Sequence, residues 1–138
     1  MRGLIPAGVL LLVTACNPKS VPSDTPADTA SSAVVPSEDS DRKIIDKLEA
    51  EARDLAKVEG CSTSADCRAA PIGVRGCGGP RDFIVYCATA TDSVSLMRKI
   101  AAADSAEAAF NKKYQVVSTC ELRMPPAVEA SGGSCVAR

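Results

Sequence analysis

Residues 61–87 read CSTSADCRAAPIGVRGCGGPRDFIVYC, and this stretch decides the fold. It holds four of the seven cysteines and the run Cys77-Gly78-Gly79-Pro80. Glycine accepts positive φ and proline fixes its own φ, so this run predicts a tight turn. The β-formers of Phe83–Cys87 predict a strand after it. Before it, residues 68–75 predict an edge strand or an extended loop, because Pro71 cannot donate a hydrogen bond within a sheet.

The length of 138 residues allows one domain, and its composition predicts a thin core. The chain has two Phe, two Tyr and no Trp, so Leu, Ile and Val must supply the buried area. Small domains of this kind often depend on covalent cross-links. The net charge of −1 does not favour binding to nucleic acid or to an anionic membrane surface. The absence of His removes hydrolytic triads and His-ligated zinc sites from consideration.

The N-terminus has the pattern of an export signal. A short basic start at Arg2 precedes an apolar run from Leu4 to Val13. As a helix this run would span about 15 Å, half the thickness of a bilayer core, so it suits the apolar region of a signal peptide and not a membrane-spanning helix. We therefore expect residues 1–15 to be a signal peptide.

The run ends in Val13-Thr14-Ala15-Cys16, which resembles the lipobox of bacterial lipoproteins. The resemblance implies that the signal is cleaved before Cys16 and that this cysteine carries lipid, which anchors the protein in a membrane. Asn17 follows, where an Asp commonly marks inner-membrane retention in Gram-negative lipoproteins. The expected location is the cell envelope, at the outer membrane facing the periplasm in a Gram-negative cell. The alternative is an ordinary cleaved signal with an unrelated cysteine.

Residues 16–40 contain the lipidated cysteine and a predicted disordered tether. Four prolines alternate with Ser, Thr, Ala and acidic residues, and too little apolar area is present to offset the entropy of ordering. This composition predicts a spacer that holds the domain of residues 41–138 away from the membrane.

Six cysteines remain after Cys16, an even number in an exported chain, which predicts three disulfides. They are Cys61, Cys67, Cys77, Cys87, Cys120 and Cys135. Fifteen connectivities are possible, and the sequence does not choose among them. One choice makes local loops, Cys67–Cys77 and Cys120–Cys135, and leaves Cys61–Cys87. Structural zinc and redox chemistry are less favoured because no C-x-x-C pair occurs, so we expect no metal and no cofactor.

The rest of the domain alternates helix and strand signals. Apolar residues at helical spacing predict one helix over residues 41–59, capped by Ser40, and a second from Thr91 or Asp92 to about Lys113. Alternating residues predict a strand over 116–122, and a short return strand over 134–137 follows a Gly-Gly turn. The expected fold is α+β, a small disulfide-stapled domain with two helices packed on a three- to four-stranded antiparallel sheet.

Residues 61–122 resemble a group of small bacterial lipoproteins without an assigned activity. The resemblance lies in Cys61, Ala65-Asp66-Cys67-Arg68, Cys77-Gly78-Gly79-Pro80, the strand ending at Tyr86, and Ser118-Thr119-Cys120. It implies an exported, cysteine-stapled α+β domain. Cys87 stands where that group would have Ser, and the tail around Ala130 lacks a cysteine, so the resemblance leaves the pairing of Cys87 and Cys135 open.

Three functional hypotheses follow. The first is an envelope lipoprotein whose non-catalytic domain binds a protein, a peptide or an envelope component, or serves a structural role. The second is a protease inhibitor that presents a loop to an enzyme cleft; its residues would be Gly78, Gly79, Pro80, Arg81 and Asp82. The third is an enzyme, for which the sequence offers only scattered carboxylates such as Asp66, Asp82 and Asp92.

Overall fold

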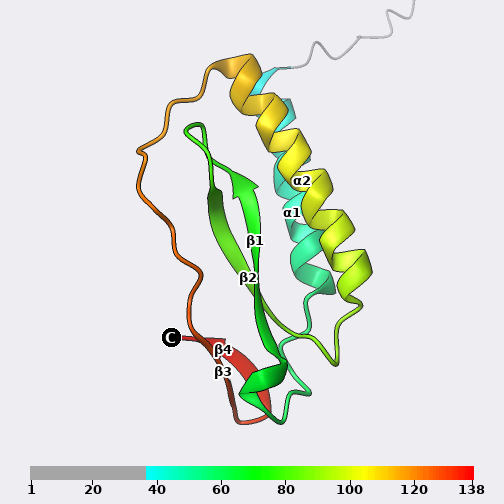
Figure 1. The fold of residues 1–138 in the computed structure, drawn as a ribbon. Helices are drawn as coiled ribbons and strands as arrows, with labels where there is room; N and C mark the ends of the chain where they lie inside the picture. Colours follow the sequence, from blue (N-terminus) through cyan, green and yellow to red (C-terminus); the bar gives the residue numbers. More distant parts are fainter. Residues whose placement is uncertain (1–36) are drawn as a thin grey trace, which may run out of the picture. The chain divides into compact units, whose positions relative to one another are not determined.

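The computed structural model describes residues 37–138. The predicted signal peptide, the lipidation site at Cys16 and the tether up to residue 36 lie outside the described residues. Two helices pack with two small antiparallel hairpins, so the α+β class is confirmed (Figure 1). The predicted single sheet of three or four strands is wrong in its connectivity, because the four strands form two separate pairs.

Helix α1 spans Glu38–Leu55, so it begins and ends earlier than predicted. Ser37, not Ser40, is the N-cap: its hydroxyl accepts from the amide of Ser40, whose own hydroxyl accepts from the amide of Ser37. This reciprocal capping box satisfies two amide groups at the helix start. After Leu55 the backbone turns extended, because residues 57–60 bond to other segments, as in the 2.7 Å bond from the Cys87 amide to the Lys57 carbonyl.

The first hairpin follows a short 3-10 turn, η1 (Ser64–Asp66). Strand β1 (Cys67–Val74) pairs antiparallel with β2 (Pro80–Cys87) in a register that sets Cys67 opposite Cys87 and Val74 opposite Pro80. The predicted turn joins them, with Gly78 and Gly79 at φ values of 95° and 79°. Proline is tolerated at position 71 because β1 is an edge strand, as the sequence predicts.

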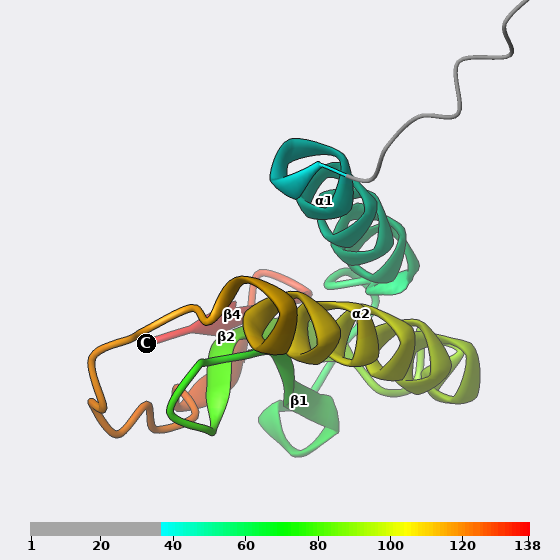
Figure 2. The same cartoon turned by 90° about the horizontal axis from the view of Figure 1, so that it is seen from above.

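Helix α2 (Ser93–Tyr114) contacts both α1 and β1 (Figure 2). Its N-cap is Asp92, one of the two predicted residues, and it accepts from the Ser95 amide at 3.1 Å. The core lies between these elements and is built from a few aliphatic side chains and alanines, as the composition predicts. Its buried members are Ala52, Ala70, Ile72, Ile84, Tyr86, Leu96, Ile100 and Ala103.

The predicted strand over residues 116–122 is wrong. Residues 116–127 form no helix or strand and run from the end of α2 past the tip of the β1–β2 hairpin (Figure 1). Side chains of α2 occupy part of one outer edge of this hairpin, that of β1: Asp104 accepts from the Gly73 amide, and Asn111 donates to the Val74 carbonyl. With those backbone groups already bonded, a neighbouring strand has no partner there.

The chain ends in the second hairpin, β3 (Val128–Ser131) and β4 (Ser134–Ala137), which contains the predicted return strand. It contacts the open end of the first hairpin. The amides of Gly60 and Cys61 donate to the Gly133 carbonyl at 2.9 and 3.2 Å, so the end of the chain is joined to the segment that leaves α1. Among residues 37–138, no helix is long and apolar enough to cross a bilayer.

Candidate functional site

The cysteines divide into two groups with different surroundings. Two disulfides, Cys61–Cys87 and Cys67–Cys135, lie buried at the open end of the first hairpin, with Cα–Cα distances of 5.6 and 5.5 Å. Cys77 and Cys120 are exposed free thiols. Thus two disulfides form instead of the three predicted, and of the three pairs in the choice given above only the remaining one, Cys61–Cys87, is confirmed.

The pairings Cys67–Cys77 and Cys120–Cys135 are wrong, and the strand geometry explains why for Cys67. Cys67 begins β1 and Cys77 lies in the turn beyond its end. An eight-residue strand spans about 26 Å, whereas a disulfide joins Cα atoms no more than about 7 Å apart. Cys67 lies opposite Cys87 in the sheet, but the two are not bonded to each other. Cys67 bonds to Cys135 in β4, and Cys87 bonds to Cys61, which precedes η1.

The buried cysteines do not offer a metal site in this state. The sulfur atoms of Cys61, Cys67 and Cys135 lie within 4.8 Å of one another. Metal ions bind the thiolate form of cysteine, and each of these sulfurs is already held in a disulfide. The cluster therefore cross-links both hairpins and the segment after α1.

The free thiols come together where the hairpin tip meets residues 118–121. The Cys77 amide donates to the Ser118 hydroxyl at 3.2 Å, and that hydroxyl lies 3.3 Å from the Cys77 sulfur. The Cys77 thiol also donates to the Thr119 carbonyl at 3.5 Å. The Arg75 guanidinium donates to the carbonyls of Thr119 and Glu121. These contacts hold residues 118–121 against the turn, so that Cys77 and Cys120, 43 positions apart in the sequence, are hydrogen-bonded to each other.

These contacts shift the pKa values of the two thiols in opposite directions. Hydrogen bonding from Cys120, then from Ser118, and the positive charge of Arg75 lower the pKa of the Cys77 thiol. The same interaction with Cys77, together with burial, raises the pKa of the Cys120 thiol. The sequence analysis missed this pair because the two residues are far apart along the chain. The Ser-x-Cys run at 118–120 was visible, but nothing in the sequence placed it beside the turn.

Gly76 allows the close contact between the two segments. A Cβ atom at this position would lie 2.3 Å from the carbonyl oxygen of Val116, a separation that real Cβ atoms essentially never show. Any larger residue would therefore push the two backbones apart. The glycine of the turn that matters most for this contact is Gly76, which the sequence analysis did not single out.

The candidate presented loop is only partly exposed as expected. Gly78 and Gly79 lie at the exposed tip, with open space around both. The side chain of Arg81 instead turns towards the helices: its Nε donates to Glu107 at 2.8 Å, and its guanidinium also pairs with Glu49. Arg81 is thus engaged by α1 and α2, while 42% of its side chain remains exposed.

Glu107 is the one buried acidic side chain among the described residues, and the sequence analysis missed it. It is 3% exposed, accepts from the Val74 amide at 2.8 Å and pairs with Arg81. A buried carboxylate is stable when it is paired and hydrogen-bonded in this way. The sequence does carry a sign that Glu107 is buried. Position 107 continues the apolar stripe of Leu96, Ile100 and Phe110 on α2, so a charged residue there is unusual.

The carboxylates named for an enzyme do not converge. Asp66 in η1 accepts from the Thr63 hydroxyl at 3.0 Å, and Asp82 in β2 pairs with Arg53 at 2.6 Å. Asp92 caps α2. Each carboxylate lies on a different element and is engaged by a different partner, so the three do not form an acid–base pair.

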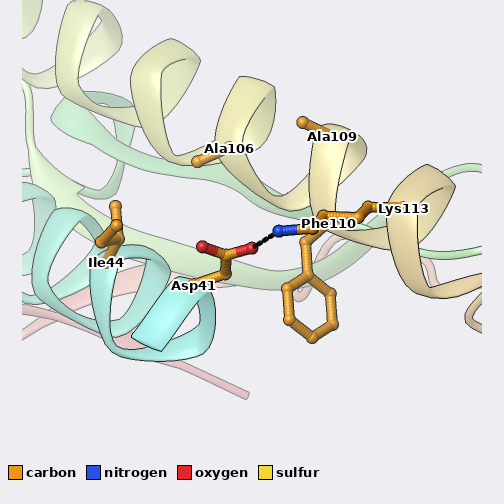
Figure 3. Close-up of a pocket in the computed structure, with 6 residues that line it drawn as sticks. All are labelled: Asp41, Ile44, Ala106, Ala109, Phe110 and Lys113. Carbon is orange, nitrogen blue, oxygen red and sulfur yellow. Dashed lines mark hydrogen bonds and ion pairs between the residues drawn. The ribbon is translucent and has the colours of Figure 1, made fainter. Parts of the chain in front are cut away.

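A hollow of about 220 Å³ lies between α1 and α2. Figure 3 shows Asp41 and Lys113 joined across it by an ion pair of 2.6 Å, with Ile44 and Phe110 among the lining residues. The hydrogen bond from Lys113, followed by that from Tyr114, lowers the pKa of Asp41. Pockets for drug-sized ligands usually have about 300–1,000 Å³, so this hollow is small for such a ligand.

Comparison of the chain with protein-family models, with curated proteins and with solved structures finds no match.

Proposed function

We propose that the protein is an exported, lipid-anchored envelope protein whose disulfide-stapled domain binds another protein. The observation that carries the proposal is the pair of buried disulfides, Cys61–Cys87 and Cys67–Cys135. Disulfides of this kind persist in oxidising compartments outside the cytoplasm. They agree with the export signal and the Cys16 lipobox read from the sequence. A single envelope location explains all three features.

A protein partner is favoured by the exposed apolar side chains of residues 116–127. Val117, Leu122 and Met124 are 93%, 85% and 69% exposed. Exposed apolar residues grouped on one segment typically mark a site of protein interaction. Two hollows, of about 220 Å³ between the helices and about 260 Å³ at the hairpin tip, are smaller than most ligand pockets. A third, of about 390 Å³, is lined by Leu55 and three charged residues, whereas pockets for small ligands are lined mainly by apolar side chains. The segment is therefore the better candidate for a binding surface.

Anchoring is tested by replacing Cys16. In the envelope of the source cell, Cys16→Ser should move the protein from the membrane fraction to the soluble fraction, because the lipid acceptor is lost. Cys77→Ser is the matched control and should stay with the membrane. Membrane attachment of Cys16→Ser after washing at high salt would contradict the anchor.

Binding is tested by photo-crosslinking in intact cells. A photoreactive residue in place of Leu122 should give an adduct of one defined mass, whereas the same residue in place of Val94, which is 77% exposed on α2, should not. Met124→Glu should weaken the Leu122 adduct, because it places a charge in the apolar contact. Equal adducts from both positions, or adducts with lipoprotein-processing proteins alone, would contradict a specific partner at this segment.

A further inference from the structure

The side chains of Cys77 and Cys120 are hydrogen-bonded to each other, and further contacts hold their two segments together. Arg75 holds two carbonyls of residues 119–121, the Cys77 amide donates to Ser118, and Gly76 permits the close approach. These contacts come from the backbone and from side chains other than the two thiols. The pair is therefore positioned before any sulfur chemistry takes place.

The pair differs from the two disulfides in its access to solvent and in its charge. Both thiols are exposed, whereas the four bonded cysteines are buried. Arg75 lies at the thiol pair, and Arg75 and Lys112 line the neighbouring hollow at the hairpin tip. Reactive cysteines are found in such exposed, electropositive surroundings, and buried structural cysteines are inert. The Ser118 hydroxyl donates to the Cys77 sulfur at 3.3 Å, and together with the charge of Arg75 this contact favours the thiolate of Cys77 over that of Cys120.

We propose that Cys77 and Cys120 form a solvent-exposed thiol–disulfide exchange site, with Cys77 as the attacking sulfur and Cys120 as the resolving one. Its substrates are accessible disulfides, either of small thiol compounds or of exported proteins. The proposal goes beyond the binding role of the domain and does not depend on it. It also assigns a chemical role to Cys77 and Cys120, the two cysteines that the buried bridges leave unbonded.

The exchange proceeds in two balanced steps. The Cys77 thiolate attacks one sulfur of a disulfide R–S–S–R, which forms a mixed disulfide on Cys77 and releases one RS⁻. Cys120 then loses its proton to solvent and attacks the Cys77 sulfur, which breaks the bond to RS and releases a second RS⁻. The two thiols of the chain are oxidised to one Cys77–Cys120 disulfide, and the substrate disulfide is reduced to two thiols.

The test uses the purified full chain carrying Cys16→Ser and glutathione disulfide as the probe. We expect release of two glutathiones per chain and a Cys77–Cys120 linkage in the peptide map, while both buried disulfides stay intact. Cys120→Ser should stop at the first step and retain one glutathione on Cys77. Cys77→Ser should react more slowly than Cys120→Ser, because the remaining thiol is less ionised.

A titration in mixtures of reduced and oxidised glutathione separates this site from a merely structural pair. Half-reduction of the Cys77–Cys120 bond should occur in mixtures that leave Cys61–Cys87 and Cys67–Cys135 oxidised, since exposed disulfides are the labile ones. A protein disulfide in place of glutathione distinguishes the two substrate sources. The proposal is overturned if each thiol keeps its own glutathione without forming the linkage, or if Cys77→Ser reacts as fast as the parent.

Discussion

Removal of the Cys67–Cys135 disulfide should destabilise the domain strongly. We consider Cys67→Ala with Cys135→Ala, made in a Cys77→Ser and Cys120→Ser parent so that no free thiol can exchange. The two cysteines are 68 residues apart, and closing a loop of that length in the unfolded chain corresponds to about 4 kcal/mol at 25 °C. Through the Cys61–Cys87 bridge, the shortest path from Cys67 to Cys135 falls from 68 to about 54 residues, which lowers this figure by only about 0.2 kcal/mol.

The loss is large compared with the stability of a small domain, typically 5–15 kcal/mol. Urea unfolding followed by far-ultraviolet circular dichroism suits this chain, which has no Trp. With a slope of about 2 kcal/mol per molar, the midpoint should fall by about 2 M. The parent with both bridges intact is the control.

The same experiment distinguishes the connectivities. If the native bridges were Cys67–Cys77 and Cys120–Cys135, the parent would already lack both, and removing Cys67 and Cys135 would have little further effect. A midpoint shift below about 0.5 M, corresponding to about 1 kcal/mol, would refute the assigned bridge and the loop-closure reasoning.

Substitutions at three further positions test the core, a partly buried carboxylate and the hairpin tip. Ile72→Ala should lower the unfolding free energy by about 2–5 kcal/mol and Ile72→Val by about 0.5–1.5, because this side chain is fully buried; equal, small effects in urea curves would contradict the core assignment. Burial raises the pKa of Asp104, so its stabilising contribution is present below its unfolded pKa and is lost as pH rises through the folded value. Asp104→Asn keeps an acceptor for the Gly73 amide but does not ionise. The Tm of this variant minus that of the parent should therefore increase from acidic to neutral pH, and a difference that does not change with pH would argue against the linkage. Gly76→Ala should force the turn away from Val116 and increase proteolysis within residues 116–127, and an unchanged cleavage pattern would contradict the close contact.

The sequence predicts most of the local structure because the local signals agree with the tertiary contacts. The turn at Gly78 and Gly79, the strand ending at Cys87, the second helix with its cap at Asp92 and the return strand around Cys135 all occur close to the predicted positions. Each is specified by neighbouring residues: glycines that accept positive φ, β-formers, or a capping carboxylate.

The predictions failed where a distant group competes for the backbone. The alternation over 116–122 is a valid strand signal, but Asp104 and Asn111 of α2 already bond the edge of β1. The first helix ends at Leu55 because the carbonyls of Lys57 and Val58 accept from Cys87 and Cys135. Such long-range bonds leave no mark in the local sequence.

The pair of free thiols, Cys77 and Cys120, could not be predicted from the sequence, because it also depends on long-range contacts. The turn containing Cys77 was recognised, and its glycines lie exposed as expected. Its pairing with Cys120 depends on how residues 116–122 lie against the hairpin, and this is set by Arg75 and Gly76. The thiol pair therefore became visible only from the fold.

Mass spectrometry of peptides from the native protein, isolated from its membrane without reduction, tests the central claim most directly. The account predicts linked peptides for Cys61–Cys87 and Cys67–Cys135, and an N-terminal peptide that begins at a lipid-modified Cys16. Alkylation of any of the four bridged cysteines before reduction, or an unmodified N-terminal peptide that retains residues 1–15, would contradict an exported, disulfide-stapled and lipid-anchored domain.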